Sequence, residues 1–80
     1  MKIPVIKKLV ENYSIDDLRA AEEALAEEAT PEITIEGEDE GEQLTHAFAA
    51  IYILEKMAES GVDFKTALRE YTSKVRTSIN

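Results

Sequence analysis

Ala47-Phe-Ala-Ala-Ile-Tyr-Ile-Leu54 is the longest apolar run in this 80-residue chain. Eight residues are far fewer than the roughly 18 needed to span a bilayer, so the run predicts a buried segment and no membrane partner. We expect it on a helix that begins near residues 39–42 and ends at Ser60, before a capping glycine. The run makes that helix apolar nearly all round for two turns, and such a helix must be surrounded by other segments.

Two helices are predicted before this central one. The first covers about residues 4–12, because Pro4 suits a first helical turn and apolar residues follow at helical spacing. The second begins after Ser14, which has an acid three residues on, in a weak form of the capping box. It is expected to end near Ala29, because a proline follows shortly afterwards.

One helix is predicted after the central one, over residues 64–79, with Asp63 as its cap. Between the second and central helices, residues 32–36 alternate β-branched and polar side chains, which indicates a possible short strand. A lone strand leaves its backbone unsatisfied, so it would pair with residues 3–6 or with the same segment of a second molecule. The chain is therefore expected to be a single small helical domain over residues 1–80, an all-α four-helix bundle with a possible short β segment.

Charge is segregated along the chain. The net charge is −8, and between Ala20 and Leu54 there are ten carboxylates and no Lys or Arg. Repulsion from a polyanion opposes direct binding of nucleic acid. The basic residues of the last helix are instead expected to pair with the acids of the second helix, or with those of its copy in another subunit. An acidic helical surface that mimics nucleic acid stays open as an alternative.

Cysteine is absent, which excludes disulfides, thiolate metal sites and thiol catalysis by this chain. Absence of cysteine suits a reducing compartment, and the N-terminal residues do not form a signal peptide. The cytoplasm is the expected location.

No catalytic signature is present, so an enzyme is not the favoured class, and no cofactor is expected. The chain has one histidine, His46, four residues after Glu42, so the two share a helix face and could offer a carboxylate and an imidazole to one metal. Two ligands make a site only if a dimer axis doubles them. In the alternative interpretation, His46 packs and forms a hydrogen bond to Glu42 or to the acidic loop.

The central helix has more apolar sides than a chain of this length is expected to cover. We therefore predict a non-enzymatic protein–protein interaction module, with a homodimer or another protein as its partner. The interface is expected to include Phe48, Ile51, Tyr52 and Leu54, since aromatic residues are enriched at such surfaces.

Three segments carry a resemblance: Glu36-Gly-Glu-Asp-Glu-Gly-Glu-Gln-Leu-Thr-His46, Met1-Lys-Ile-Pro-Val-Ile-Lys-Lys-Leu-Val-Glu-Asn12 and Asp63-Phe-Lys-Thr-Ala-Leu-Arg-Glu-Tyr71. With them the chain resembles a family of small acidic bacterial proteins of about the same length that has no established function. The resemblance spans nearly the whole sequence and implies a complete protein, and it assigns no catalytic residue.

Overall fold

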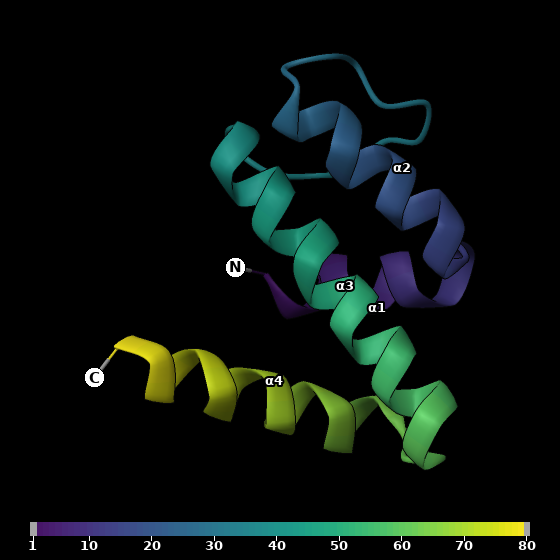
Figure 1. Cartoon of the computed structure of the whole chain (residues 1–80), viewed down its shortest axis with the longest axis vertical. Helices are drawn as coiled ribbons and strands as arrows, with labels where there is room; N and C mark the ends of the chain where they lie inside the picture. Colours follow the sequence, from purple (N-terminus) through teal and green to yellow (C-terminus); the bar gives the residue numbers. More distant parts are fainter. Residues whose placement is uncertain (1, 80) are drawn as a thin grey trace.

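The computed structural model describes the backbone of residues 2–79 and the side chains of residues 2–75. Over this range it contains no strand and four α-helices: α1 (Ile3–Asn12), α2 (Ile15–Ala26), α3 (Glu40–Ser60) and α4 (Phe64–Ile79). The predicted all-α fold is confirmed. α3 runs through the centre, and the other three helices each pack against it (Figure 1). α2 and α4 lie at opposite ends of the molecule in this view.

Local chemistry explains where the first two helices begin. Pro4 sits in the first turn of α1, where its missing N–H has no helical partner to lose. α2 starts with a complete capping box: the Ser14 hydroxyl accepts from the Asp17 N–H, and the Asp17 carboxylate accepts from the Ser14 N–H, each at 3.2 Å. The sequence predicted only a weak form of the capping box, because Asp replaces the usual Glu, but both of its hydrogen bonds are formed.

α2 ends at Ala26, three residues earlier than predicted. Glu28 adopts a left-handed conformation with φ of 60°, and two hydrogen bonds close the helix end, from Glu28 N–H to Leu25 O and from Ala29 N–H to Ala24 O. This pair of bonds is a Schellman motif, which satisfies the last carbonyls of a helix and usually has glycine at the left-handed position. The prediction used Pro31 as the signal for the helix end, but the Schellman motif ends α2 before the chain reaches that proline.

The segment between α2 and α3 is an irregular loop, so the possible strand over residues 32–36 is wrong for this chain. Its proposed partner within the chain, residues 3–6, is the first turn of α1 and has no strand edge to offer. Ile35 is instead 3% exposed and anchors the loop through its side chain. Ion pairs also attach the loop to α1, from Lys8 to Glu36 at 3.6 Å and from Lys2 to Glu38 at 3.8 Å.

The two longer helices have clear caps. The Asp39 carboxylate accepts from the Glu42 N–H at 2.8 Å at the start of α3, and Gly61 ends it with φ of 66°. The Asp63 carboxylate accepts from the Thr66 N–H at 2.8 Å at the start of α4. Thus three residues, 61–63, both end one helix and start the next.

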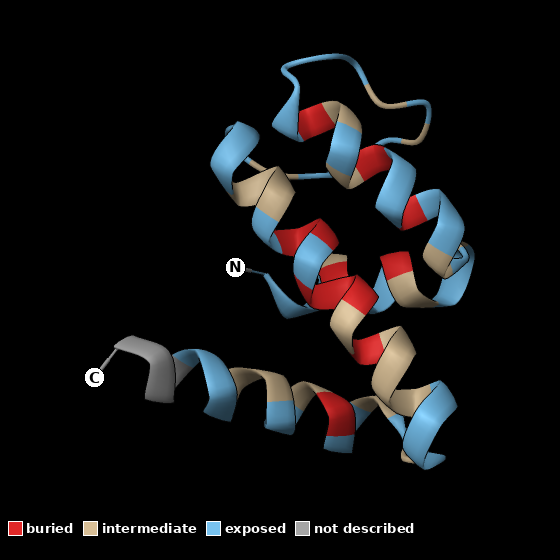
Figure 2. Cartoon of the chain, in the orientation of Figure 1, coloured by how far each residue is buried: buried red, intermediate tan, exposed pale blue. Residues whose placement is uncertain are grey.

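Apolar side chains of all four helices and of the loop meet in one core, and α3 supplies the largest share (Figure 2). The buried core residues are Ile6, Leu9, Leu18, Ala21, Leu25, Ile35, Ala49, Ala50, Ile51, Ile53 and Ala67. The alanines let neighbouring helices approach α3 closely, so most of its apolar surface is covered within the chain. Among the described helices, none combines the length and the apolar character required to cross a membrane.

Candidate functional site

One side of α3 stays open to solvent in the middle of its buried stretch. Phe48 is 48% exposed, although Ala47 and Ala49 beside it are completely buried. Tyr52, one turn further on, is half-buried. Because residues four apart share a helix face, Phe48 and Tyr52 form one aromatic column on the outside of α3.

The other two residues predicted for an interface face inward. Ile51 is 7% exposed and belongs to the core, and Leu54 is half-buried and packs against it. The structure therefore places Phe48 and Tyr52 at the accessible surface and the two aliphatic residues behind it. We call the surface around Phe48 and Tyr52 the aromatic face.

α4 borders the aromatic face on one side. The rings of Tyr52 and Tyr71 have centroids 5.4 Å apart at an interplanar angle of 56°, and the Lys74 ammonium lies 5.4 Å from the centroid of the Tyr52 ring. Both contacts are favourable, the first as a tilted aromatic pair and the second as a cation–π interaction. Burial raises the pKa of the Tyr71 hydroxyl. These contacts hold Tyr52 in place while its outer edge stays accessible.

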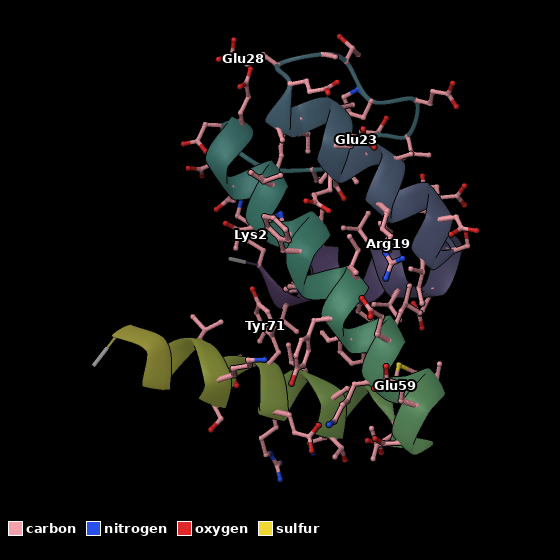
Figure 3. The ribbon with its side chains drawn as sticks, viewed as in Figure 1. Lys2, Arg19, Glu23, Glu28, Glu59 and Tyr71 are labelled. Carbon is pink, nitrogen blue, oxygen red and sulfur yellow. The ribbon has the colours of Figure 1, made fainter. Side chains whose placement is uncertain are left out.

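α2 borders the opposite side of the aromatic face. Glu55 is seven residues after Phe48, so it lies on the same side of α3, and its carboxylate is 3.3 Å from the Arg19 guanidinium of α2. Figure 3 shows Arg19 from α2 and Tyr71 from α4 both beside α3. The stretch of α3 that carries the aromatic face therefore contacts α2 at Glu55 and α4 at Tyr52.

A shallow hollow continues from the aromatic face over α4. Its volume is about 490 Å³, and it is lined by Tyr52, Thr66, Arg69, Glu70, Ser73 and Lys74. Glu70 is ion-paired with Lys56 at 3.7 Å. Its two basic side chains, Arg69 and Lys74, suit carboxylates, whereas the Thr66 hydroxyl already donates to Asp63.

His46 occupies a second, buried position with a defined hydrogen-bond pattern. The residue is completely buried, its Nε2 lies 2.9 Å from the Lys2 backbone N–H, and its Nδ1 lies 2.7 Å from the Glu36 carbonyl oxygen. The amide can only donate and the carbonyl can only accept, so the ring is neutral, with its proton on Nδ1. The expected hydrogen bond between His46 and the acidic loop is confirmed, and the loop atom that accepts it is the main-chain carbonyl oxygen of Glu36. The bond to Lys2 was not foreseen.

The pair proposed as metal ligands is engaged in other contacts in this arrangement. Glu42 Oε1 accepts from the Glu38 N–H at 2.9 Å, and this bond, with smaller contributions from Lys2 and the N-terminus, lowers the pKa of Glu42. Both nitrogens of His46 already have main-chain partners. Among the described residues, no three or more His, Asp or Glu side chains are grouped so that they could hold a metal ion. A metal at His46 would first have to displace a hydrogen bond.

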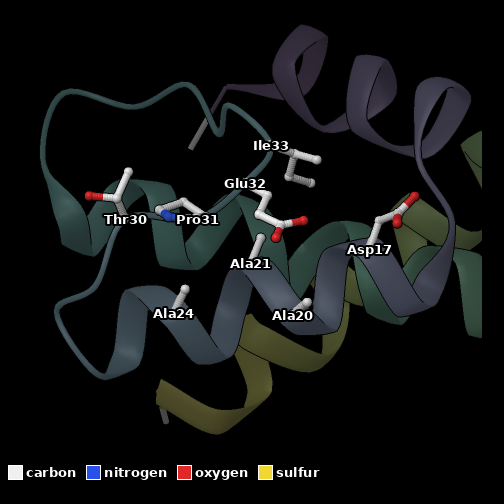
Figure 4. Close-up of a pocket in the computed structure, with 8 residues that line it drawn as sticks. All are labelled: Asp17, Ala20, Ala21, Ala24, Thr30, Pro31, Glu32 and Ile33. Atoms are coloured by element: carbon white, nitrogen blue, oxygen red, sulfur yellow. The ribbon is translucent and has the colours of Figure 1, made fainter.

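A second hollow, of about 260 Å³, lies between α2 and the loop that follows it (Figure 4). Its floor consists of Ala20, Ala21 and Ala24, and its rim includes Asp17 and Glu32. The Asp17 carboxylate is used in the capping box. Small side chains form most of its floor, and one of its two acids is used in a helix cap, so we regard this hollow as a packing gap over the alanines of α2.

The model of a family of unknown function (DUF6952) matches residues 1–80. No curated protein and no solved structure matches the chain significantly.

Proposed function

Because the chain belongs to this family of unknown function, we propose its role from its own surface: a non-enzymatic protein–protein interaction module that forms a homodimer through the aromatic face. The observation that carries the proposal is the exposure of Phe48, at 48%, within a stretch of α3 that is otherwise buried. Large aromatic side chains exposed in this way are typical of residues that anchor protein interfaces. The cytoplasm is included in the proposal, since a chain with no cysteine suits a reducing compartment.

Phe48 is not among the buried core residues, whereas its sequence neighbours Ala47 and Ala49 are completely buried. A polar residue at position 48 is therefore expected to leave the burial of these two alanines unchanged. Tyr52 adds a second aromatic ring that is already held by Tyr71 and Lys74, so little side-chain entropy is lost when a partner covers it.

Sedimentation equilibrium of the wild type and of Phe48→Ser tests the proposal. Burying the exposed half of a phenylalanine contributes about 1 kcal/mol per copy. A symmetric dimer contains the residue twice, so the substitution should weaken the dimer by about 2 kcal/mol, or roughly thirtyfold in Kd. Far-UV circular dichroism should be unchanged, because the residue is outside the core.

Ile3→Ser is the matched control. Ile3 is also 48% exposed and lies on α1, whose contact with α3 through Lys2 and His46 is away from the aromatic face. The control should dimerise as the wild type does. A wild type that sediments as a monomer at all concentrations, or equal weakening by both substitutions, would rule out the proposed interface.

The two earlier alternatives stay predictions with their own tests. A metal site using Glu42 and His46 predicts stoichiometric zinc, manganese or iron in the purified protein by elemental analysis. Mimicry of nucleic acid predicts that the protein displaces DNA from DNA-binding proteins. No contact among the described residues favours either one over the interaction module.

A further inference from the structure

The segregation of charge along the sequence is kept in three dimensions. α2 and the following loop contain most of the ten carboxylates of the acidic block, whereas α4 has four basic residues and one acid. The two helices lie at opposite ends of the molecule (Figures 1 and 3). The aromatic face lies between them, with α2 adjoining it through Arg19 and Glu55 and α4 through Tyr71 and Tyr52.

Among the described side chains, no ion pair joins α4 to α2; the pairs join α1 to the loop, α2 to α3, and α3 to α4. Over the described side chains, nothing supports the expectation that the basic residues of the last helix pair with the second helix of the same chain; the Arg76 side chain lies outside that range. The other expectation, that they pair with its copy in another subunit, stays a prediction.

We propose that the aromatic face binds a second copy of this chain in an antiparallel orientation, so that α2 of each copy lies over α4 of the other. This inference rests on the proposed homodimer and adds its orientation. The aromatic columns of Phe48 and Tyr52 meet at the two-fold axis. The carboxylates of α2, such as Glu23, then approach the donors around the hollow on α4, including Arg69.

Charge decides between the two simple orientations. A parallel pairing places acidic α2 on acidic α2 and basic α4 on basic α4, and like charges at an interface are strongly unfavourable. The antiparallel pairing places opposite charges together at two equivalent contacts. A stable dimer of standard size buries about 800 Å² per partner. The described molecule measures 32 × 29 × 19 Å, so its broad side has room for such an interface.

Single charge reversals test the orientation. Glu23→Lys and Arg69→Glu each turn one attractive contact into a repulsive one, and the two-fold axis counts each change twice. Each variant should weaken the dimer about tenfold at low salt. The double variant restores opposite charges at both contacts and has the wild-type net charge, so it should dimerise within about twofold of the wild type.

Matched controls separate local pairing from net charge. Glu11→Lys and Lys7→Glu make the same changes in net charge on exposed positions of α1. Both should dimerise as the wild type does when all variants are compared by sedimentation equilibrium. The wild-type dimer should weaken as the salt concentration rises, and the dimer of the double variant should weaken to the same extent.

The outcomes distinguish the orientation from the dimer itself. A dimer that depends on Phe48 but is indifferent to both reversals overturns the antiparallel arrangement and leaves the proposed function standing. Tighter association of Glu23→Lys indicates that α2 lies on α2, which also overturns it. A wild type that never dimerises removes both proposals.

Discussion

Replacing His46 tests whether its two main-chain hydrogen bonds hold α1, the loop and α3 together. His46→Phe keeps a planar ring of similar size but has no polar atom, so the Lys2 N–H and the Glu36 carbonyl both lose their partner. Leaving a buried polar group unsatisfied costs about 1–3 kcal/mol. Both groups are only partly buried, so we take about 1 kcal/mol for each and expect a total loss of about 2 kcal/mol.

This loss is large for a protein of this size. Native stability is roughly 0.1 kcal/mol per residue, which is about 8 kcal/mol for a chain of 80 residues. Urea unfolding followed by circular dichroism should show the loss as a lower midpoint with an unchanged slope. His46→Gln is the matched variant, because its side-chain oxygen can accept from the Lys2 N–H. It should recover about half of the lost stability. If His46→Phe unfolds at the wild-type midpoint, the two bonds do not stabilise the fold and the argument fails.

Three further predictions test individual caps. Glu28→Gly should stabilise the fold by about 1 kcal/mol in thermal unfolding, because Glu28 has a left-handed φ of 60°. Glu27→Gly, at φ of −92°, should give no gain, and equal gains at both positions would refute the Schellman argument. Gly61→Ala should cost about 1 kcal/mol through the backbone alone, since φ is +66° and nothing lies within 4 Å of the added Cβ; an unchanged midpoint in the same assay would contradict this. Hydrogen bonds from the Thr66 hydroxyl and N–H lower the pKa of Asp63 from its usual 3.8, so its stabilising contribution is full above that value and is lost as pH falls through the lower folded-state pKa. Acid titration of the melting temperature should therefore fall more steeply below about pH 4 in the wild type than in Asp63→Asn, and parallel curves would show that the ionised carboxylate contributes nothing.

The helices could be predicted from local chemistry because their signals are local. Ser14, Asp63 and Gly61 are capping residues whose partners lie within four positions, and the structure confirms each of them. The end of α2 was missed because Glu28 is not a residue that signals a left-handed turn. The possible strand was inferred from alternation alone, and alternation cannot show that Ile35 is anchored by the core and has no strand partner in the chain.

The candidate site was only partly predictable. Exposure of Phe48 follows from the positions of α2 and α4 on either side of α3, which depend on helix crossing angles that no sequence pattern specifies. For the same reason Ile51 and Leu54 could not be separated from Phe48 and Tyr52 beforehand. Tyr71 and Lys74 are three residues apart, so the sequence alone places them on one face of α4. It does not show that both contact the ring of Tyr52 on α3. The contact between His46 and Lys2 joins residues 44 positions apart and had no local signal.

NMR spectra recorded over a dilution series test the central claim most directly, namely that a second copy covers the aromatic face. The side-chain signals of Phe48 and Tyr52 should shift together as the protein is diluted from roughly millimolar to micromolar concentration, a range that spans the Kd of a typical specific dimer. The methyl signals of Ile3, equally exposed but on α1, should stay constant. If the Phe48 signals are independent of concentration, or move only as much as those of Ile3, the aromatic face is not where this chain associates.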